Sequence, residues 1–109
     1  MSHFNKSNNI PLEELGAGLK RQILGYESDL MLVRVFFEQG AIGAVHTHPH
    51  QQVTYLEKGR FEVEIGSNKD ILKAGDSFTV PANMSHGVLA LEEGILLDAF
   101  SPAREDFLK

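Results

Sequence analysis

Histidine is concentrated in one short stretch of the chain. Three of the five histidines lie in the sequence HTHPH at residues 46–50, and two glutamines follow directly. In a β-strand, residues i and i+2 share a face, so His46 and His48 are predicted to project the same way, with ring nitrogens close enough to share one ion. Pro49 predicts a bend, which leaves the direction of His50 open. The stretch is therefore either a solvated polar turn or half of a metal site.

Alternating hydrophobic residues predict short β-strands around these histidines. In the segment 60–66 (RFEVEIG), apolar residues alternate with glutamates, which predicts one buried face and one solvated face. Strands are also predicted at residues 19–26 and 30–37 and in the runs DILKAGD, SFTVP, GVLALEEG and ILLDAF, with turns at residues 27–29 and 67–68. Short strands separated by turn signals every 8–12 residues or so are typical of a β-sandwich or small barrel.

The strand after the histidines and the two ends of the chain complete this prediction. A strand from Gln52 would place Gln52, Thr54 and Leu56 on one face. Residues 12–15 (LEEL) are too short to assign, and residues 102–109 are expected to form one helical turn after a proline. With no internal repeat and no linker, residues 1–109 are predicted to form a single all-β domain.

Composition restricts the possible partners. The net charge is −5 and lysine and arginine form no dense run, which argues against nucleic acid or an anionic membrane as the main partner. An anionic small molecule remains possible because one or two local arginines are enough to bind it. The chain has no cysteine, which excludes disulfides and thiolate chemistry. It also has neither a membrane-spanning apolar run nor a signal-peptide pattern, so a cytoplasmic location is expected.

The spacing of glycines and histidines resembles the two motifs of the cupin superfamily. The first motif corresponds to Gly40, His46, His48, Gln52 and Gly59, with glutamine where most cupins have glutamate. The second corresponds to Gly75, Pro81, Asn83 and His86; Asn83 replaces the usual glycine, and Ala90 stands where a final asparagine is common. Together the motifs span residues 40–90, about half of the chain. The resemblance implies a jelly-roll β-barrel of two antiparallel sheets.

Two segments are similar to the KdgF family of small pectin-degradation cupins. These are HTHPHQQVTY, from His46, and LLDAFSPAREDFL near the end of the chain. That family linearises 4,5-unsaturated uronates, the monosaccharides that pectin and alginate lyases release. The resemblance implies one divalent metal ion bound by His46, His48, Gln52 and His86. It also implies that Asp98 and Arg104, with Phe100 between them, complete the pocket.

The residue types suit that reaction. Imidazole-rich ligation accommodates Ni, Zn, Fe or Mn, and neutral ligands leave the ion a strong Lewis acid. Asp98 lies in an otherwise apolar strand, where a carboxylate is costly unless it is paired or functional, and is a candidate for moving the proton. Arg104 offers a planar fork that suits the substrate carboxylate. Phe100 lies two residues from Asp98 on the same face and could form a wall against the sugar.

Other interpretations of the site residues remain open. Asp98 could face solvent or a neighbouring subunit, Arg104 could pair with Glu105 or Asp106, and Phe100 could be a core residue. The same pocket could belong to a non-catalytic module that binds a sugar acid or a metal, or to a cupin dioxygenase.

The run LMLVRVFF at residues 30–37 predicts self-association. Its apolar residues fall at both odd and even positions, so both faces of the predicted strand are apolar. One face is therefore expected inside the barrel and the other against a second subunit. We therefore expect a homodimer. Arg34 within this run could line the pocket or cover apolar surface with its stem.

Overall fold

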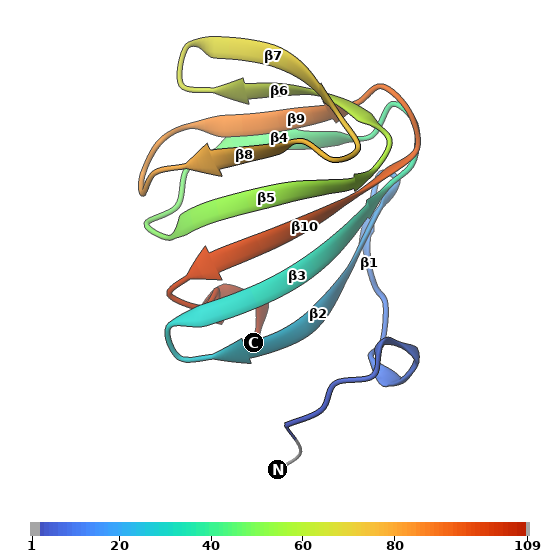
Figure 1. The fold of residues 1–109 in the computed structure, drawn as a ribbon, viewed down its shortest axis with the longest axis vertical. Helices are drawn as coiled ribbons and strands as arrows, with labels where there is room; N and C mark the ends of the chain where they lie inside the picture. The colour runs from blue at the N-terminus through green and yellow to red at the C-terminus, as the bar shows by residue number, and fades with distance from the viewer. Residues whose placement is uncertain (1–2, 109) are drawn as a thin grey trace.

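Two antiparallel sheets face each other in the computed structural model, which describes residues 3–108. The larger sheet has the strand order β1-β2-β3-β10-β5-β8 and the smaller sheet has the order β4-β9-β6-β7 (Figure 1). The strands are β1 (Glu13–Gly16), β2 (Leu19–Glu27), β3 (Leu30–Phe37), β4 (Ile42–His46), β5 (Gln51–Lys58), β6 (Arg60–Ile65), β7 (Asn68–Lys73), β8 (Ser77–Val80), β9 (His86–Ala90) and β10 (Gly94–Ser101), and two short 3-10 helices are η1 (Ser7–Asn9) and η2 (Glu105–Phe107). The predicted all-β architecture with a C-terminal helical turn is confirmed.

Some strand ends differ from the prediction by one residue. β2 extends to Glu27, so the turn before β3 holds only Ser28 and Asp29. The turn after β6 lies at residues 66–67, because Asn68 already pairs with Ile65 as the first residue of β7. The unassigned segment at residues 12–15 mostly belongs to β1, which pairs with β2. No helix within residues 3–108 is long and apolar enough to cross a membrane.

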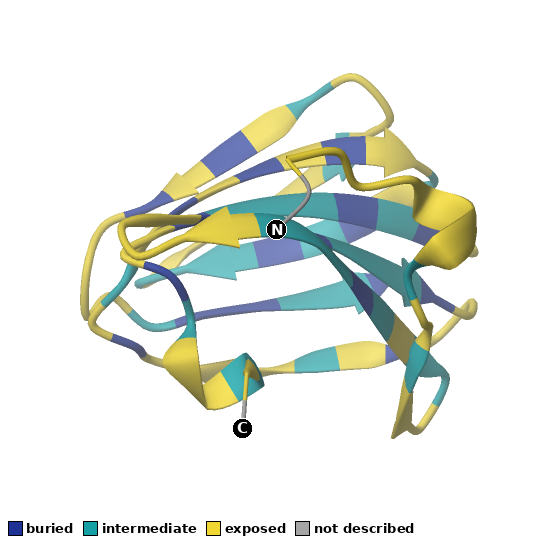
Figure 2. Cartoon of the chain, turned by 90° about the horizontal axis from the view of Figure 1, so that it is seen from below, coloured by how far each residue is buried: buried dark blue, intermediate teal, exposed yellow. Residues whose placement is uncertain are grey.

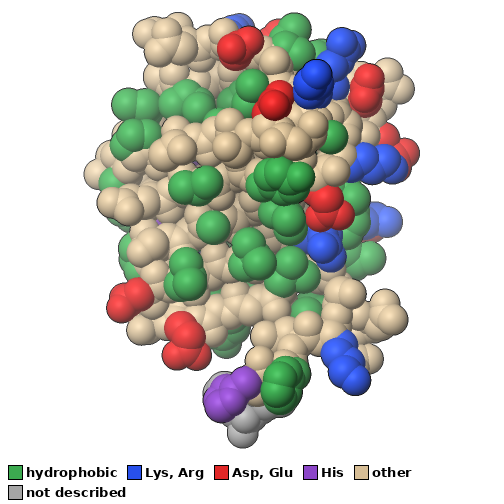
Figure 3. Space-filling model, viewed as in Figure 1, with side chains coloured by type: hydrophobic (Ala, Val, Ile, Leu, Met, Phe, Trp, Pro, Cys, Tyr) green, Lys and Arg blue, Asp and Glu red, His purple; other side chains and the backbone are tan. Residues whose placement is uncertain are grey.

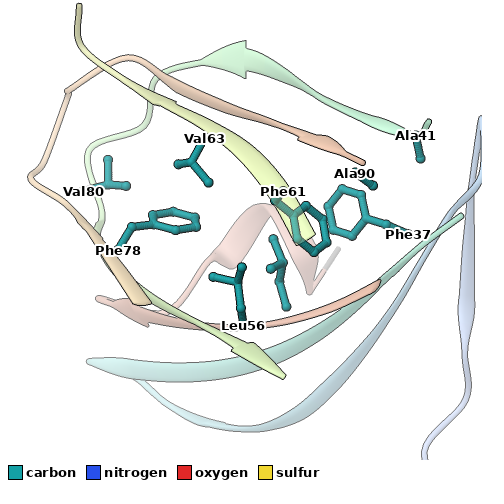
Figure 4. Packing of buried hydrophobic residues seen from close by; sticks show 9 residues of the cluster. Phe37, Ala41, Leu56, Phe61, Val63, Phe78, Val80 and Ala90 are labelled. Carbon is teal, nitrogen blue, oxygen red and sulfur yellow. The ribbon is translucent and has the colours of Figure 1, made fainter. Parts of the chain in front are cut away.

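The space between the sheets is filled by alternate residues of both. Phe61 and Val63 are buried on β6 as the sequence predicted, and Phe61 packs edge-on against Phe37 at 5.1 Å between ring centroids. Leu56 and Phe78 reach the same cluster from the larger sheet (Figure 4). Figure 2 shows that buried segments lie within the strands, while the N-terminal arm and most turns are exposed. Burying these apolar side chains is the main force that holds the two sheets together.

The outer surface of the larger sheet is apolar in its middle. Hydrophobic side chains gather there, with most charged side chains along the margins (Figure 3). The N-terminal arm crosses this surface at β2, where the buried amide of Gln22 donates hydrogen bonds to the carbonyls of Ser7 (2.7 Å) and Ile10 (2.9 Å). The arm therefore covers β2 and leaves the outer surface of β3, β10 and β5 open.

The inner face of β5 and β10 changes from apolar to polar along the strands. Leu56 lies opposite Leu96 within the core, whereas the next inward pair is Thr54 opposite Asp98. Because the side chains of directly opposed residues are neighbours in a sheet, this register brings polar groups from distant parts of the chain together beside the core.

Candidate metal centre

Three histidines from three segments converge at one end of the sandwich. His46 ends β4 and lies directly opposite His86, the first residue of β9. The ring centroids are 4.4 Å apart for His46 and His86, 4.7 Å for His48 and His86, and 5.4 Å for His46 and His48. One potential ligand atom from each histidine lies within 4.8 Å of the others. These three side chains could therefore hold one metal ion.

His48 reaches the group from a loop, so the prediction that a strand's two-residue period directs both His46 and His48 is wrong for this residue. β4 ends at His46, and His48 precedes Pro49 in the connection to β5. The loop is held by the backbone N–H of Asn83, which donates to the His48 carbonyl at 2.8 Å. Asn83 has a φ of 68°, a left-handed conformation that asparagine tolerates better than most residues, which accounts for its standing in place of glycine. His48 is buried while His46 is exposed, which leaves the group open to solvent on one side.

All three imidazoles are oriented by backbone carbonyls. The Nδ1 atoms lie near the carbonyl oxygens of Ala44 for His46 (2.7 Å), of His50 for His48 (3.0 Å) and of Met84 for His86 (3.0 Å). A carbonyl only accepts hydrogen bonds, so each Nδ1 carries the proton and each Nε2 is left with its lone pair. This arrangement, in which the second ring nitrogen fixes the tautomer, is usual for histidines that bind metal.

The Nε2 atoms of His48 and His86 are suited to binding a cation. His86 Nε2 is buried and has no hydrogen-bond partner, which costs free energy unless the atom has a ligand. His48 Nε2 lies 2.9 Å from the Oε1 of Gln52, and with the proton on Nδ1 both of these atoms are acceptors. Burial lowers the pKa of His48 and of His86, which keeps them in the neutral form that binds metal.

A chain of hydrogen bonds links Gln52 to Asp98. The Gln52 amide Nε2 donates to Thr54 Oγ1 at 2.8 Å, and the Thr54 hydroxyl donates to Asp98 Oδ1 at 2.6 Å. Gln52 Nε2 also lies 3.5 Å from Asp98 Oδ1. These bonds turn the Gln52 Oε1 toward His48. Thr54 was not among the predicted site residues, although strand alternation had already placed it on the same face as Gln52.

Asp98 is the candidate acid or base of the site. Burial raises the pKa of its carboxyl to about 6, and the hydrogen bond from Thr54 and the positive charge of Arg104 oppose this rise. The possibility that Asp98 faces solvent is wrong, because its side chain points inward beside Thr54. A carboxyl with such a pKa exchanges a proton readily near neutral pH.

Arg104 and Phe100 lie together next to this group. Phe100 is 2% exposed, packs in the core with Met31, and lies edge-on to His48 at 5.7 Å between ring centroids. The Arg104 guanidinium lies 5.0 Å from the Phe100 ring centroid and donates from Nε (3.1 Å) and Nη2 (2.9 Å) to the carboxylate of Asp106. Both alternative interpretations are therefore confirmed: Phe100 is a core residue, which also borders the site, and Arg104 pairs with Asp106.

The structure also gives the positions of His50 and Arg34, which the sequence alone did not determine. His50 supports the group through its backbone carbonyl, while its buried Nδ1 has no hydrogen-bond partner. Arg34 does not line the pocket: it alternates with the buried Met31 and Val33 on β3 and forms an ion pair with Glu57 on the outer surface (3.2 Å).

Comparisons with known proteins identify the family of the chain. The family model described as "Cupin domain" matches residues 33–99. The pectin degradation protein KdgF of Dickeya dadantii (strain 3937) is 48% identical, over 99% of this chain and all of that protein. The chain is a cupin of the KdgF family. An RmlC-like cupin from Shewanella frigidimarina NCIMB 400 superposes with a TM-score of 0.95 at 47% identity, over 98% of this chain and 96% of that one. KdgF from Halomonas sp. superposes with a TM-score of 0.92 at 38% identity, over 95% of this chain and 98% of that one.

Proposed function

We propose that this cupin catalyses the metal-dependent ring opening of 4,5-unsaturated uronate monosaccharides to 5-keto-4-deoxyuronates. The substrates would come from pectin or alginate breakdown, and the KdgF relative is named for pectin degradation. The observation that carries the proposal is the inward-facing carboxylate of Asp98, joined through Thr54 to Gln52 beside three convergent histidines. We also propose the cytoplasm as the compartment, which fractionation of the native host tests.

The divalent ion of this proposal would be held by the Nε2 atoms of His46, His48 and His86, with the Gln52 Oε1 as a fourth ligand. All four ligands are neutral, which suits Ni, Zn, Fe or Mn. When bound, such an ion supplies Lewis-acid stabilisation of negative charge on a substrate oxygen. The chain itself keeps these donor atoms free of protons, because backbone carbonyls occupy the other ring nitrogen of each histidine.

Asp98 would move the proton. As a carboxylate it takes the proton from the anomeric hydroxyl, the bond from C1 to the ring oxygen breaks, and the electron pair passes to that oxygen. The resulting enolate has its double bond between C4 and C5 and its negative charge on the former ring oxygen. Asp98, now protonated, delivers its proton to C4, and the enolate becomes the 5-keto group, so the reaction is an isomerisation with no net gain or loss of atoms. A pKa of about 6 lets one carboxyl perform both steps near neutral pH.

Arg104 and Phe100 would orient the sugar. Asp106 binds the Nε and one N–H of Nη2, so the remaining N–H groups of Arg104 are those that would receive the substrate carboxylate. The ring of Phe100 borders both Arg104 and His48, a position in which an apolar surface can pack against a sugar ring.

The test is an NMR assay with unsaturated galacturonate, following loss of the cyclic form. Ring opening faster than the spontaneous reaction supports the enzyme, and Asp98→Asn should reduce the rate to the spontaneous one while ligand binding persists. Binding without any turnover in the wild-type protein would instead favour a non-catalytic sugar-acid module. Oxygen consumption with enolic substrates would favour a cupin dioxygenase.

A further inference from the structure

Arg104 contacts a second residue of the C-terminal segment (residues 102–108) besides Asp106. Its Cζ lies over the ring of Phe107, 4.3 Å from the ring centroid. The backbone N–H of Phe107 donates to the Arg104 carbonyl at 3.0 Å, which closes the turn of η2. Side chains three residues apart lie on the same side of a 3-10 helix, so this turn brings the ring next to the guanidinium. Asp106 therefore binds one edge of the guanidinium, and Phe107 supports it from a second direction.

Phe107 is itself held by an arginine from the other end of the chain. The Cζ of Arg21, on β2, lies 3.9 Å from the Phe107 ring centroid. Arg21 is directly opposite Val35 of β3, which packs against the core, so its side chain lies on the inner face of the larger sheet. Phe107 also lies edge-on to Phe100, at 5.8 Å between ring centroids. One ring thus contacts both arginines and the aromatic residue that borders the metal centre.

The position of Arg21 needs an explanation, because a charged side chain on an inner sheet face is costly unless it has partners. Its Nη2 donates to Glu13 Oε2 on β1 at 3.3 Å, but its buried Nε has no hydrogen-bond partner. A cation over an aromatic ring is attracted more strongly when both are shielded from water, and the Arg21 side chain is only 16% exposed. None of the described contacts of Arg21 reaches a histidine or Asp98. What it holds in place is therefore Phe107.

We infer that Phe107 and Arg21 are positioning residues for Arg104, and that they set the affinity of the site for a substrate carboxylate. The inference rests on the proposed function, in which Arg104 receives that carboxylate. Asp106 is an exposed residue two positions from Arg104, and a single surface ion pair contributes little. Phe107 adds a contact that is anchored in the protein, because it packs against the buried cluster around Met31. A donor already held in its bound orientation loses less conformational entropy on binding, which increases affinity.

Ring-opening kinetics test the inference. Phe107→Leu removes the ring but keeps most of the apolar volume; it should raise KM roughly tenfold and change kcat by less than about twofold, because the carboxylate is bound alike in ground and transition states. Arg21→Met removes the guanidinium without touching Arg104 and should raise KM about threefold. Phe107→Tyr keeps the ring and should have nearly the wild-type KM. Phe36→Leu is the matched control, because Phe36 is a partly buried phenylalanine of β3 with no described ring contact to the C-terminal segment.

Two further measurements do not depend on turnover. Calorimetric titration with galacturonate, a saturated uronate, should show weaker binding to Phe107→Leu and Arg21→Met by the same factors as KM. In nitrogen-edited NMR of arginine-labelled protein, the Nε–H signal of Arg104 should be shifted by the ring current of Phe107. The signal is assigned by its absence in Arg104→Lys, and Phe107→Leu should remove the shift.

The results that would overturn the inference are an unchanged KM and affinity in Phe107→Leu and Arg21→Met, a fall in kcat at unchanged KM, or an unaltered Arg104 signal in Phe107→Leu. A wild type that binds no uronate would also overturn it. If the wild type opens no ring but galacturonate binding weakens in both variants, the proposed function fails and the inference stands. Thermal melting and metal content separate loss of positioning from loss of folding or of the metal centre. Arg21→Met carries the same test if Phe107→Leu does not fold.

Discussion

Thr54→Val tests how Asp98 is controlled, because it removes one hydroxyl and changes little of the side-chain shape. The hydroxyl donates to Asp98 Oδ1 at 2.6 Å and accepts from Gln52 Nε2 at 2.8 Å. Thr54 is fully buried, so no water can readily replace it. Without this donor the ionised form of Asp98 loses a stabilising partner, and the pKa of the carboxyl rises further above its present value of about 6.

The size of the effect follows from the type of hydrogen bond. A bond to a charged group contributes about 1.5–3 kcal/mol, which corresponds to a rise of roughly one to two pH units in the pKa of Asp98. The carboxylate starts the proposed reaction, so the rate increases with pH as Asp98 ionises. At about pH 6.5 the rate of the variant should therefore be roughly 3- to 25-fold below that of the wild type, whereas at about pH 9 the two should nearly coincide.

The assay is the NMR ring-opening rate across the pH range, corrected for the spontaneous reaction, with metal content measured at each pH. Thr54→Ser keeps the hydroxyl and is the matched control. The pH at which its ring-opening rate rises should stay near that of the wild type. A Thr54→Val rate that falls by the same factor at every pH would point to a structural defect. If the rise of the rate with pH occurs at the same pH in Thr54→Val as in the wild type, the assignment of this rise to the ionisation of Asp98 is refuted.

Three further changes test other parts of the site. His86→Ala removes the buried Nε2 that has no partner, so metal affinity should fall on the order of 100-fold or more, measured by metal content after dialysis. Gln52→Glu adds a ligand charge, which should tighten metal binding but lower turnover about tenfold by weakening the Lewis acid. Asp106→Asn removes the exposed partner of Arg104; it should change the free energy of unfolding by less than about 1 kcal/mol while KM rises several-fold, because the guanidinium loses its orientation.

The local pattern of the sequence predicted much of the fold. Alternation is a property of neighbouring residues, and it correctly placed Gln52, Thr54 and Leu56 on one buried face and Phe61 and Val63 on another. The resemblance to the two cupin motifs pointed to the three histidines, which the structure brings together at one end of the sandwich.

The remaining features depend on contacts between distant segments. His46 faces His86, and Asp98 faces Thr54, through strand registers that turns and irregular pairings set over the whole sheet. His48 left the strand because the chain turns at Pro49, and strand ends are less predictable than strand centres. The role of Gln22 under the N-terminal arm had no signal in its own neighbourhood, since its partners lie 12 and 15 residues away.

The most direct test of the central claim is the ring-opening rate of one preparation as purified, after exhaustive chelation, and after a divalent ion is returned. We predict opening well above the spontaneous rate, its loss on chelation, and its recovery with the ion, with no recovery in Asp98→Asn. Fully metallated protein that opens the ring no faster than buffer would contradict the claim that this cupin is a uronate-linearising enzyme.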